Sequence, residues 1–164
     1  MKSIFDDVSN DCSKIVTKTY STSFSLATKM LSKGIRQHIY NIYGFVRFAD
    51  EIVDSFHDYD KEVLFKDFSL DLEKSLKNKI HLNPILNSFQ ATYHKFNISK
   101  DLVDSFMSSM EKDLHKKKYM SNQEYEDYIY GSADVVGLMC LKVFVNGDTE
   151  KYEELKSFAM RLGS

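Results

Sequence analysis

Apolar residues recur every three or four positions along most of the chain, which is the spacing of a helix with one buried face. Alternating strand patterns are nearly absent, and one proline and six glycines leave few places to interrupt a helix. The pattern therefore predicts an all-α protein. Outside the stretch 35–54, the expected apolar stripes are Val8, Cys12 and Ile15; Leu64, Phe68, Leu72 and Leu76; Phe89, Tyr93 and Phe96; Val103, Phe106, Met110 and Leu114; and Tyr152, Leu155, Ala159 and Leu162.

Capping residues mark where several of these helices begin and end. Asp60 is placed to cap one helix, and Asn83 followed by Pro84 is typical of the start of another. The capping box "SNQE" at 121–124 predicts a long helix through about residue 145, which "NG" would end. The hydroxyl-rich segment "YSTSF" at 20–24 predicts a helix break, with a second short helix starting near Phe24.

The stretch 35–54 carries two parallel lines of side chains. The first is apolar, follows a 4-3-4-3-4 spacing and should face the core; it consists of Ile35, Ile39, Ile42, Val46, Ala49 and Val53. The second keeps the same rhythm about 80° around the helix, at the edge of the core rather than opposite it. Its members are Tyr43, Arg47, Asp50 and Asp54.

Asp50 and Asp54 lie one helical turn apart, so their Cβ atoms are about 5–6 Å from each other. Two carboxylates in one small volume suit a divalent cation. Magnesium prefers carboxylate oxygen and is commonly held by one or two carboxylates together with substrate phosphates. Arg47 could then donate charge-assisted hydrogen bonds to a diphosphate.

A simpler interpretation is that these charged side chains lie on a solvated helix face and bind no ligand. Arg47 can pair with Asp50 at i+3 or with Glu51 at i+4 for a few tenths of a kcal/mol. An isolated pair of aspartates four residues apart is more often surface charge than a metal site. The functional interpretation therefore depends on other segments of the chain.

Three other segments have both a structural and a functional interpretation. Ser21 and Ser23 could bind phosphate oxygens at the helix break, or serve as an ordinary cap. Gly131 and Gly137 are unusual inside a helix and indicate close approach of another helix or of an apolar ligand. Asp113, taken alone, would be a surface residue.

Composition and charge exclude several classes of function. The 22 basic and 24 acidic residues nearly cancel, which argues against a nucleic-acid partner. Two cysteines form neither a disulfide framework nor a metal pattern, which favours a cytoplasmic protein. The histidines show no zinc-binding spacing. The longest apolar run, residues 135–141, is far shorter than the roughly 20 residues that span a bilayer. The sequence does not exclude peripheral contact with a membrane.

Five segments, taken in order, carry a resemblance to a known family: "YSTSF", "IYGFVRFADEIVD", "EKD", "YIYGSADVVG" and "RLGS". Together they resemble the N-terminal half of the squalene/phytoene synthase family, over essentially the whole chain. The resemblance implies an all-α, isoprenoid synthase-type helical bundle in truncated form. It also implies magnesium-dependent, head-to-head joining of two prenyl diphosphates through a cyclopropyl diphosphate intermediate.

The same resemblance implies roles for individual residues. Asp50 and Asp54 match the first aspartate-rich motif, which holds magnesium, and Asp113 matches a recurrent acid near the metal. Glu51 stands where many members have a second aspartate. Ser21, Ser23 and Arg47 match positions that contact diphosphate oxygens, and the reaction centre would be lined by Tyr43 and Tyr128.

The segment "GSADVVG" matches the place where the family's small-residue helix opens beside the prenyl tail. The matching positions are Ser132, Ala133, Val136 and Gly137. Asp134 and Val135 depart from the more usual "GVAGTVG" pattern, where glycine and threonine stand at these positions.

On this basis residues 1–164 form the N-terminal portion of a single isoprenoid synthase domain. The second aspartate-rich motif, expected directly after "RLGS", is absent, so we expect little turnover from these residues alone and self-association through exposed apolar faces. The expected reaction of the parent protein converts geranylgeranyl diphosphate to phytoene. The alternatives are squalene or dehydrosqualene synthesis from farnesyl diphosphate, and a non-catalytic helical interaction module. A head-to-tail prenyltransferase or terpene cyclase is disfavoured by "YSTSF" and "YIYGSADVVG".

Overall fold

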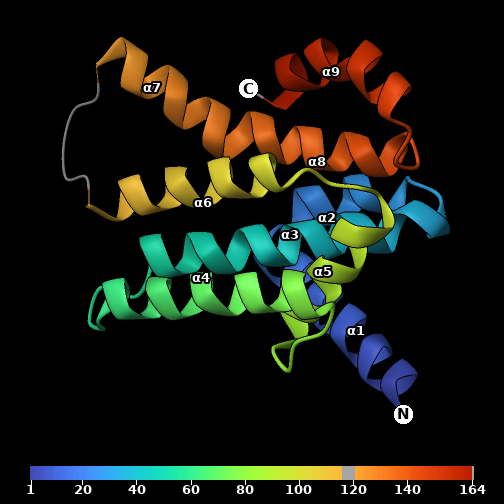
Figure 1. Cartoon of the computed structure of the whole chain (residues 1–164), viewed down its shortest axis with the longest axis horizontal. Helices are drawn as coiled ribbons and strands as arrows, with labels where there is room; N and C mark the ends of the chain where they lie inside the picture. The colour runs from blue at the N-terminus through green and yellow to red at the C-terminus, as the bar shows by residue number, and fades with distance from the viewer. Residues whose placement is uncertain (116–120, 164) are drawn as a thin grey trace.

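A computed structural model describes residues 1–115 and 121–163, and all the regular elements in this part of the chain are helical (Figure 1). The predicted all-α class is therefore confirmed. The elements are α1 (Lys2–Tyr20), α2 (Thr22–Lys29), α3 (Lys33–Asp54), α4 (Lys61–Asn78), α5 (Pro84–Lys95), α6 (Lys100–His115), α7 (Asn122–Ile129), the π-helical turn η1 (Tyr130–Asp134), α8 (Val135–Phe144) and α9 (Thr149–Gly163).

Several expected helix boundaries are confirmed by their capping bonds. The Asp60 side chain accepts a hydrogen bond from the backbone N–H of Val63 at the start of α4. Asn83 caps α5 through the N–H groups of its first turn, and Ser121 accepts from Glu124 N–H at the start of α7. At the end of α8, Gly147 has a φ of 76°, a conformation that glycine adopts without strain.

Helix α3 is the central element. It packs against α1, α2, α4, α5, α6 and α8, and Figure 1 shows it running beside α4 and below α6. At its middle, the fully buried ring of Phe45 stacks on Phe89 of α5 with centroids 4.1 Å apart. The same ring contacts Phe68 of α4 at 6.0 Å and Phe106 of α6 at 5.4 Å. Four helices therefore meet at one aromatic cluster, whose large apolar area stabilises the centre of the fold.

The apolar line predicted along α3 is confirmed. Ile39, Ile42, Ala49 and Val53 are each at most 5% exposed, and the remaining two members are partly buried against the core. Further buried side chains on α3 include Tyr40, Phe45 and Ile52, so the buried surface of this helix is wider than the predicted stripe. This fits a helix with neighbours on several sides.

The stripe predicted for the first helix is wrong. Val8 is 50% exposed and Ile15 is 62% exposed, whereas the fully buried positions are Ser9, Ser13 and Thr17. The buried face of α1 is therefore made of small hydroxyl residues. Their hydroxyls are satisfied locally: that of Ser9 donates to a backbone carbonyl one turn earlier, as does that of Thr17.

Small side chains on α1 allow a close approach to its two partners. The Ser13 hydroxyl lies 2.6 Å from that of Ser88 on α5. A Cβ added to Gly44 of α3 would lie 3.0 Å from the same Ser13 oxygen. Close packing, rather than large apolar side chains, therefore joins α1 to α3 and α5, and a periodicity argument based on apolar residues could not identify that face.

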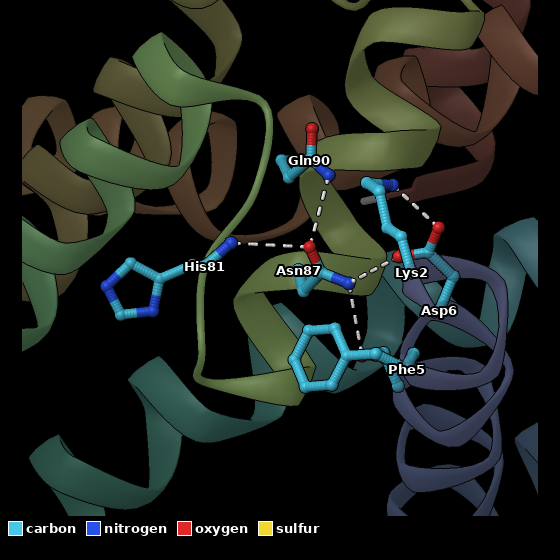
Figure 2. Close-up of polar contacts among 7 residues, drawn as sticks. Lys2, Phe5, Asp6, His81, Asn87 and Gln90 are labelled. Carbon is cyan, nitrogen blue, oxygen red and sulfur yellow. Dashed lines mark hydrogen bonds and ion pairs between the residues drawn. The ribbon is translucent and has the colours of Figure 1, made fainter.

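A buried amide adds hydrogen bonds to this interface. Asn87 of α5 donates from Nδ2 to Asp6 Oδ1 of α1 at 3.0 Å (Figure 2). The same nitrogen donates to Ser9 Oγ, also on α1, at 3.1 Å. The Oδ1 of Asn87 accepts from the backbone N–H of His81 and from Gln90 Nε2. Because all of these groups are partly or fully buried, the satisfied amide fixes the position of α5 against α1.

The long helix expected after "SNQE" is present, but it is widened at η1. Gly131 in this turn packs tightly on α6, where an added Cβ would lie 2.5 Å from Ser109 Cβ. The Ser132 hydroxyl donates to the Tyr128 carbonyl at 2.6 Å. At position 131, close approach of another helix therefore explains the glycine.

The stripe expected in the last helix is confirmed only in part. Tyr152 is 6% exposed and Ala159 is partly buried, but Leu155 is 43% exposed. The side chain of Leu162 lies outside the described residues. Within the part of the chain that the structure describes, none of the helices has the length and apolarity needed to cross a membrane.

Gly131→Ala should lower the free energy of unfolding by about 2 kcal/mol, because the new methyl group would overlap Ser109. Gly34→Ala is the matched control, since nothing lies within 4 Å of its added Cβ, and it should change stability by less than about 1 kcal/mol or increase it. Urea unfolding followed by circular dichroism measures both. The double change Ser109→Gly and Gly131→Ala should recover part of the loss; no recovery would mean that the overlap is not the cause.

Candidate functional site

The last turns of α3 present the predicted polar line at the edge of the core. The side chains of Arg47 and Asp50 are 23% and 31% exposed, while Asp54 near the helix end is exposed. This intermediate position matches the expected angle between the apolar and polar lines. Arg47 is not free, because Nη1 contacts Asp50 Oδ2 at 2.9 Å and Nη2 contacts Glu51 Oε2 at 2.6 Å. Both ion pairs of the simpler interpretation are therefore present.

Asp50 lies in an environment that opposes its charge. Burial is the main cause that raises its pKa from 3.8 to about 6, and a hydrogen bond with Asp54 adds to the effect. The negative charges of Asp54 and Asp113 raise the pKa further, whereas the Arg47 guanidinium lowers it. Even with its arginine partner, the ionised form of Asp50 is therefore destabilised, and further positive charge nearby would stabilise it.

Asp113 on α6 and Tyr128 on α7 face the same region. Burial raises the pKa of Asp113, and the charge of Asp54 raises it further. Burial also raises the pKa of the Tyr128 phenol, with smaller contributions from Asp113, Asp50 and Asp54. Residues more than 50 positions apart in sequence thus act on one another electrostatically, so three helices contribute to one acidic region.

The break between α1 and α2 lies against the same part of α3. Ser21 is extended, and its Oγ accepts a hydrogen bond from Phe24 N–H at 3.2 Å. The Phe24 ring stacks on Tyr43 with centroids 4.9 Å apart. Burial raises the pKa of Tyr43, while Arg47 and a hydrogen bond with Ser21 lower it. Ser21 is therefore brought to the site, whereas Ser23 is exposed on α2.

The residues expected beside a prenyl tail follow η1 and α8. Ser132, Ala133, Val136 and Gly137 are all half-buried, and Val136 packs against the core. At the departure from the family pattern, Asp134 has a raised pKa because of burial. Its Oδ1 is buried without a hydrogen-bond partner among the described residues.

A cavity of about 420 Å³ lies between α6 and the segment formed by α7 and η1. Asp113 and Tyr128 line it, together with Ser109 and Gly131 at the tight helix contact. Asp50 and Asp54 are not among its lining residues. The acidic region therefore overlaps this cavity only in part, through Asp113.

Asp50, Asp54 and Asp113 do not form a preformed metal-binding site. Among the described residues, no group of three or more His, Cys, Asp or Glu side chains is arranged to hold a metal ion. The donor set nevertheless fits a weaker mode of binding. Asp50 and Asp54 are close enough to share a hydrogen bond, and two carboxylates with water and phosphate oxygens satisfy magnesium.

Two residues that contact Arg47, Tyr20 and Glu51, were not assigned a role at the site from the sequence. The Tyr20 ring lies 4.8 Å from Arg47 Cζ, and the Glu51 side chain is only 16% exposed. Tyr20 opens the segment "YSTSF", but its contact depends on how α1 crosses α3. For Glu51, the sequence showed the i+4 spacing to Arg47 and the match to a position where many family members have a second aspartate.

Comparison with known proteins identifies the family. The model of the squalene/phytoene synthase family matches residues 17–164, which is most of the chain. The chain therefore belongs to the squalene/phytoene synthase family, as its five segments predicted.

Individual relatives agree with this assignment. A 4,4'-diapophytoene synthase of Staphylococcus haemolyticus (strain JCSC1435) is 25% identical over 156 residues, covering 90% of this chain and 51% of the relative. A dehydrosqualene synthase solved in complex with ligand has a TM-score of 0.82 at 23% identity, covering 96% of this chain and 53% of that one. The squalene synthase HpnC from Alicyclobacillus acidocaldarius has a TM-score of 0.80 at 20% identity, covering 96% and 59%.

These structural likenesses confirm the all-α isoprenoid synthase fold. The chain spans about half the length of the relatives that it matches.

Asp50→Asn should stabilise the fold at neutral pH. A raised folded-state pKa means that the native protein binds more protons than the unfolded chain between about pH 4 and 6, so ionisation of Asp50 costs stability as the pH rises through this window. In metal-free buffer we expect the variant to be about 1 kcal/mol more stable than the wild type at pH 7.5, and equally stable near pH 4. Chemical unfolding at both pH values measures this.

The control is Asp58→Asn, a change at an exposed aspartate just beyond α3, which should alter stability little at either pH. An Asp50→Asn variant that is less stable than the wild type at pH 7.5 would show that the Arg47 ion pair outweighs burial and carboxylate repulsion.

Proposed function

We propose that this chain forms the diphosphate-capturing side of an enzyme that condenses two prenyl diphosphates head to head. The observation that carries the proposal is the convergence of Asp50, Asp54 and Asp113 from two helices beside Tyr128. Membership of the squalene/phytoene synthase family supports the same reaction class. An acidic region at the end of an apolar core suits a ligand with a metal-bound head and an apolar tail.

Asp50 and Asp54 would hold magnesium, with Asp113 completing the acidic surroundings. Magnesium, when bound, neutralises the diphosphate and promotes its departure as a leaving group. Arg47 and Ser21 supply hydrogen-bond donors for the diphosphate oxygens, and Ser23 is a further candidate at the α2 N-terminus. Since these groups lie beside the core, the developing charge would be stabilised by fixed protein groups rather than by bulk water.

The allylic carbocation left by ionisation needs protection rather than an enzyme nucleophile. Tyr43 and Tyr128 offer aromatic faces, which attract cations, at the border of the site. Half-buried small residues on η1 and α8 would accept the prenyl tail and keep water away from it. The residues in this proposed role are Ser132, Ala133, Val136 and Gly137.

The chain length of the substrate is the finer part of the proposal. The sequence favours geranylgeranyl diphosphate and a phytoene product, with farnesyl diphosphate as the alternative. Two similar structures are named for dehydrosqualene and squalene, which gives weight to the farnesyl alternative. Both substrates therefore belong in the test.

We expect this chain to bind farnesyl or geranylgeranyl thiodiphosphate, which resist ionisation, only when magnesium is present. Calorimetric titration with magnesium and with EDTA measures this directly. Asp54→Asn should weaken binding at least tenfold, because one of two carboxylate ligands loses its charge, whereas Asp58→Asn should bind like the wild type. The ratio of the wild-type affinities for farnesyl and geranylgeranyl thiodiphosphate reports the preferred tail length.

The competing interpretation is a helical interaction module in which the aspartates are surface charge. It predicts a folded chain, helical by circular dichroism, that binds neither thiodiphosphate. Binding that persists in EDTA, or that is unchanged by Asp54→Asn, would also contradict the proposed carboxylate role.

A further inference from the structure

The three guanidinium nitrogens of Arg47 donate unequally to two acids. Nε donates to Glu51 Oε2 at 3.1 Å, and Nη2 donates to the same oxygen at 2.6 Å. Nη1 alone donates to Asp50 Oδ2, at 2.9 Å. Glu51 therefore makes the two-pronged contact that fixes the plane of the guanidinium, while Asp50 takes a single bond at its far corner.

The position of Glu51 is itself fixed. Hydrogen bonds with Ser55, Arg47 and Tyr20 reach its carboxylate, and its side chain is 16% exposed against 31% for Asp50. The Tyr20 ring supports the other side of the contact, 4.8 Å from Arg47 Cζ. Glu51 is thus the more enclosed acid, and its Oε2 already accepts two hydrogen bonds from Arg47.

This arrangement distinguishes the two acids as partners for a cation. A metal ion that binds Asp50 displaces only one bond of Arg47. The two bonds to Glu51 remain, so the guanidinium keeps its plane while Nη1 becomes available on the side where Asp50 lies. A metal ion that bound Glu51 Oε2 would instead have to displace two charge-assisted hydrogen bonds from Arg47, at a side chain that is only 16% exposed.

We propose that Glu51 is a positioning residue that holds Arg47, with Tyr20 beneath it, so that Nη1 can exchange Asp50 for an oxygen of a metal-bound diphosphate. Glu51 does not itself bind the metal, although it directly follows Asp50 in sequence. The identity of the incoming anion rests on the proposed function. The holding of Arg47 by Glu51 does not, because it is a property of the ligand-free chain.

The first test measures the holding itself, without any ligand. The chain contains three arginines, so the ¹⁵N-labelled Nε–H signal of Arg47 can be assigned by its loss in Arg47→Lys. Hydrogen exchange of this proton with water should be slow in the wild type and at least tenfold faster in Glu51→Gln. Glu51→Asp, which keeps the charge, should recover part of the protection, and Glu153→Gln on α9 is the control.

The second test separates metal binding from anion binding. With Mn²⁺ alone, followed by electron paramagnetic resonance, Glu51→Gln should bind as well as the wild type, while Asp54→Asn should bind more weakly. With Mn²⁺ and farnesyl thiodiphosphate, Glu51→Gln should lose about tenfold in affinity. When Glu51→Gln is added to the Arg47→Lys variant, it should lower the affinity for thiodiphosphate much less than tenfold, because Glu51 acts through Arg47.

A fast-exchanging Nε–H in the wild type, or one unaffected by Glu51→Gln, would overturn the proposal. So would loss of Mn²⁺ binding in Glu51→Gln to the extent seen in Asp54→Asn, since that would make Glu51 a ligand. A wild type that binds no thiodiphosphate would count against the proposed function instead, and the exchange experiment would still decide the role of Glu51.

Discussion

The site depends on one constraint: carboxylates that repel one another are held together at the end of α3. Burial of that helix keeps them in place. Asp50 and Asp54 would separate if α3 could fray, but the apolar residues beside them are almost fully buried. Packing of α3 on six neighbouring helices therefore keeps like charges together. The free energy that favours core burial is large enough to sustain a local cost of this kind, because a domain buries many apolar side chains and the site holds few charges.

The same helix explains why the unusual face of α1 matters. Small residues at Ser13 and Gly44 let α1 lie close to α3, and the last turn of α1 then ends beside Arg47. Tyr20 and Ser21 reach the site only because of this approach. A larger apolar stripe on α1 would hold the helices further apart. The polar, closely packed interface is therefore part of how the site is built.

The sequence predicted the features that a single helix determines. The angle between the apolar and polar lines of α3 follows from the helical period alone, and so does the spacing of Asp50 and Asp54. The face of α1 was predicted wrongly because apolar periodicity does not detect packing through serine and threonine. The closeness of Asp113 and Tyr128 to α3 depends on how α6 and α7 cross it, and the need for glycine at position 131 in η1 depends on contact with Ser109. Neither is encoded in local spacing, although the family resemblance pointed to the residues involved.

The ion pairs of Arg47 do not require a choice between a structural and a functional interpretation. An exposed pair of this kind contributes little, since water screens it and ordering long side chains costs entropy. Here the pair is half-buried, and Asp50 still carries a raised pKa beside its arginine. One guanidinium bond is therefore insufficient compensation for this carboxylate, which leaves a site that favours additional positive charge. A divalent ion alone would meet that need but would face the Arg47 charge at close range. Under the proposed function, a divalent ion that arrives with a diphosphate would provide a partner for both Asp50 and the released Nη1, which is why we propose the joint ligand rather than either component.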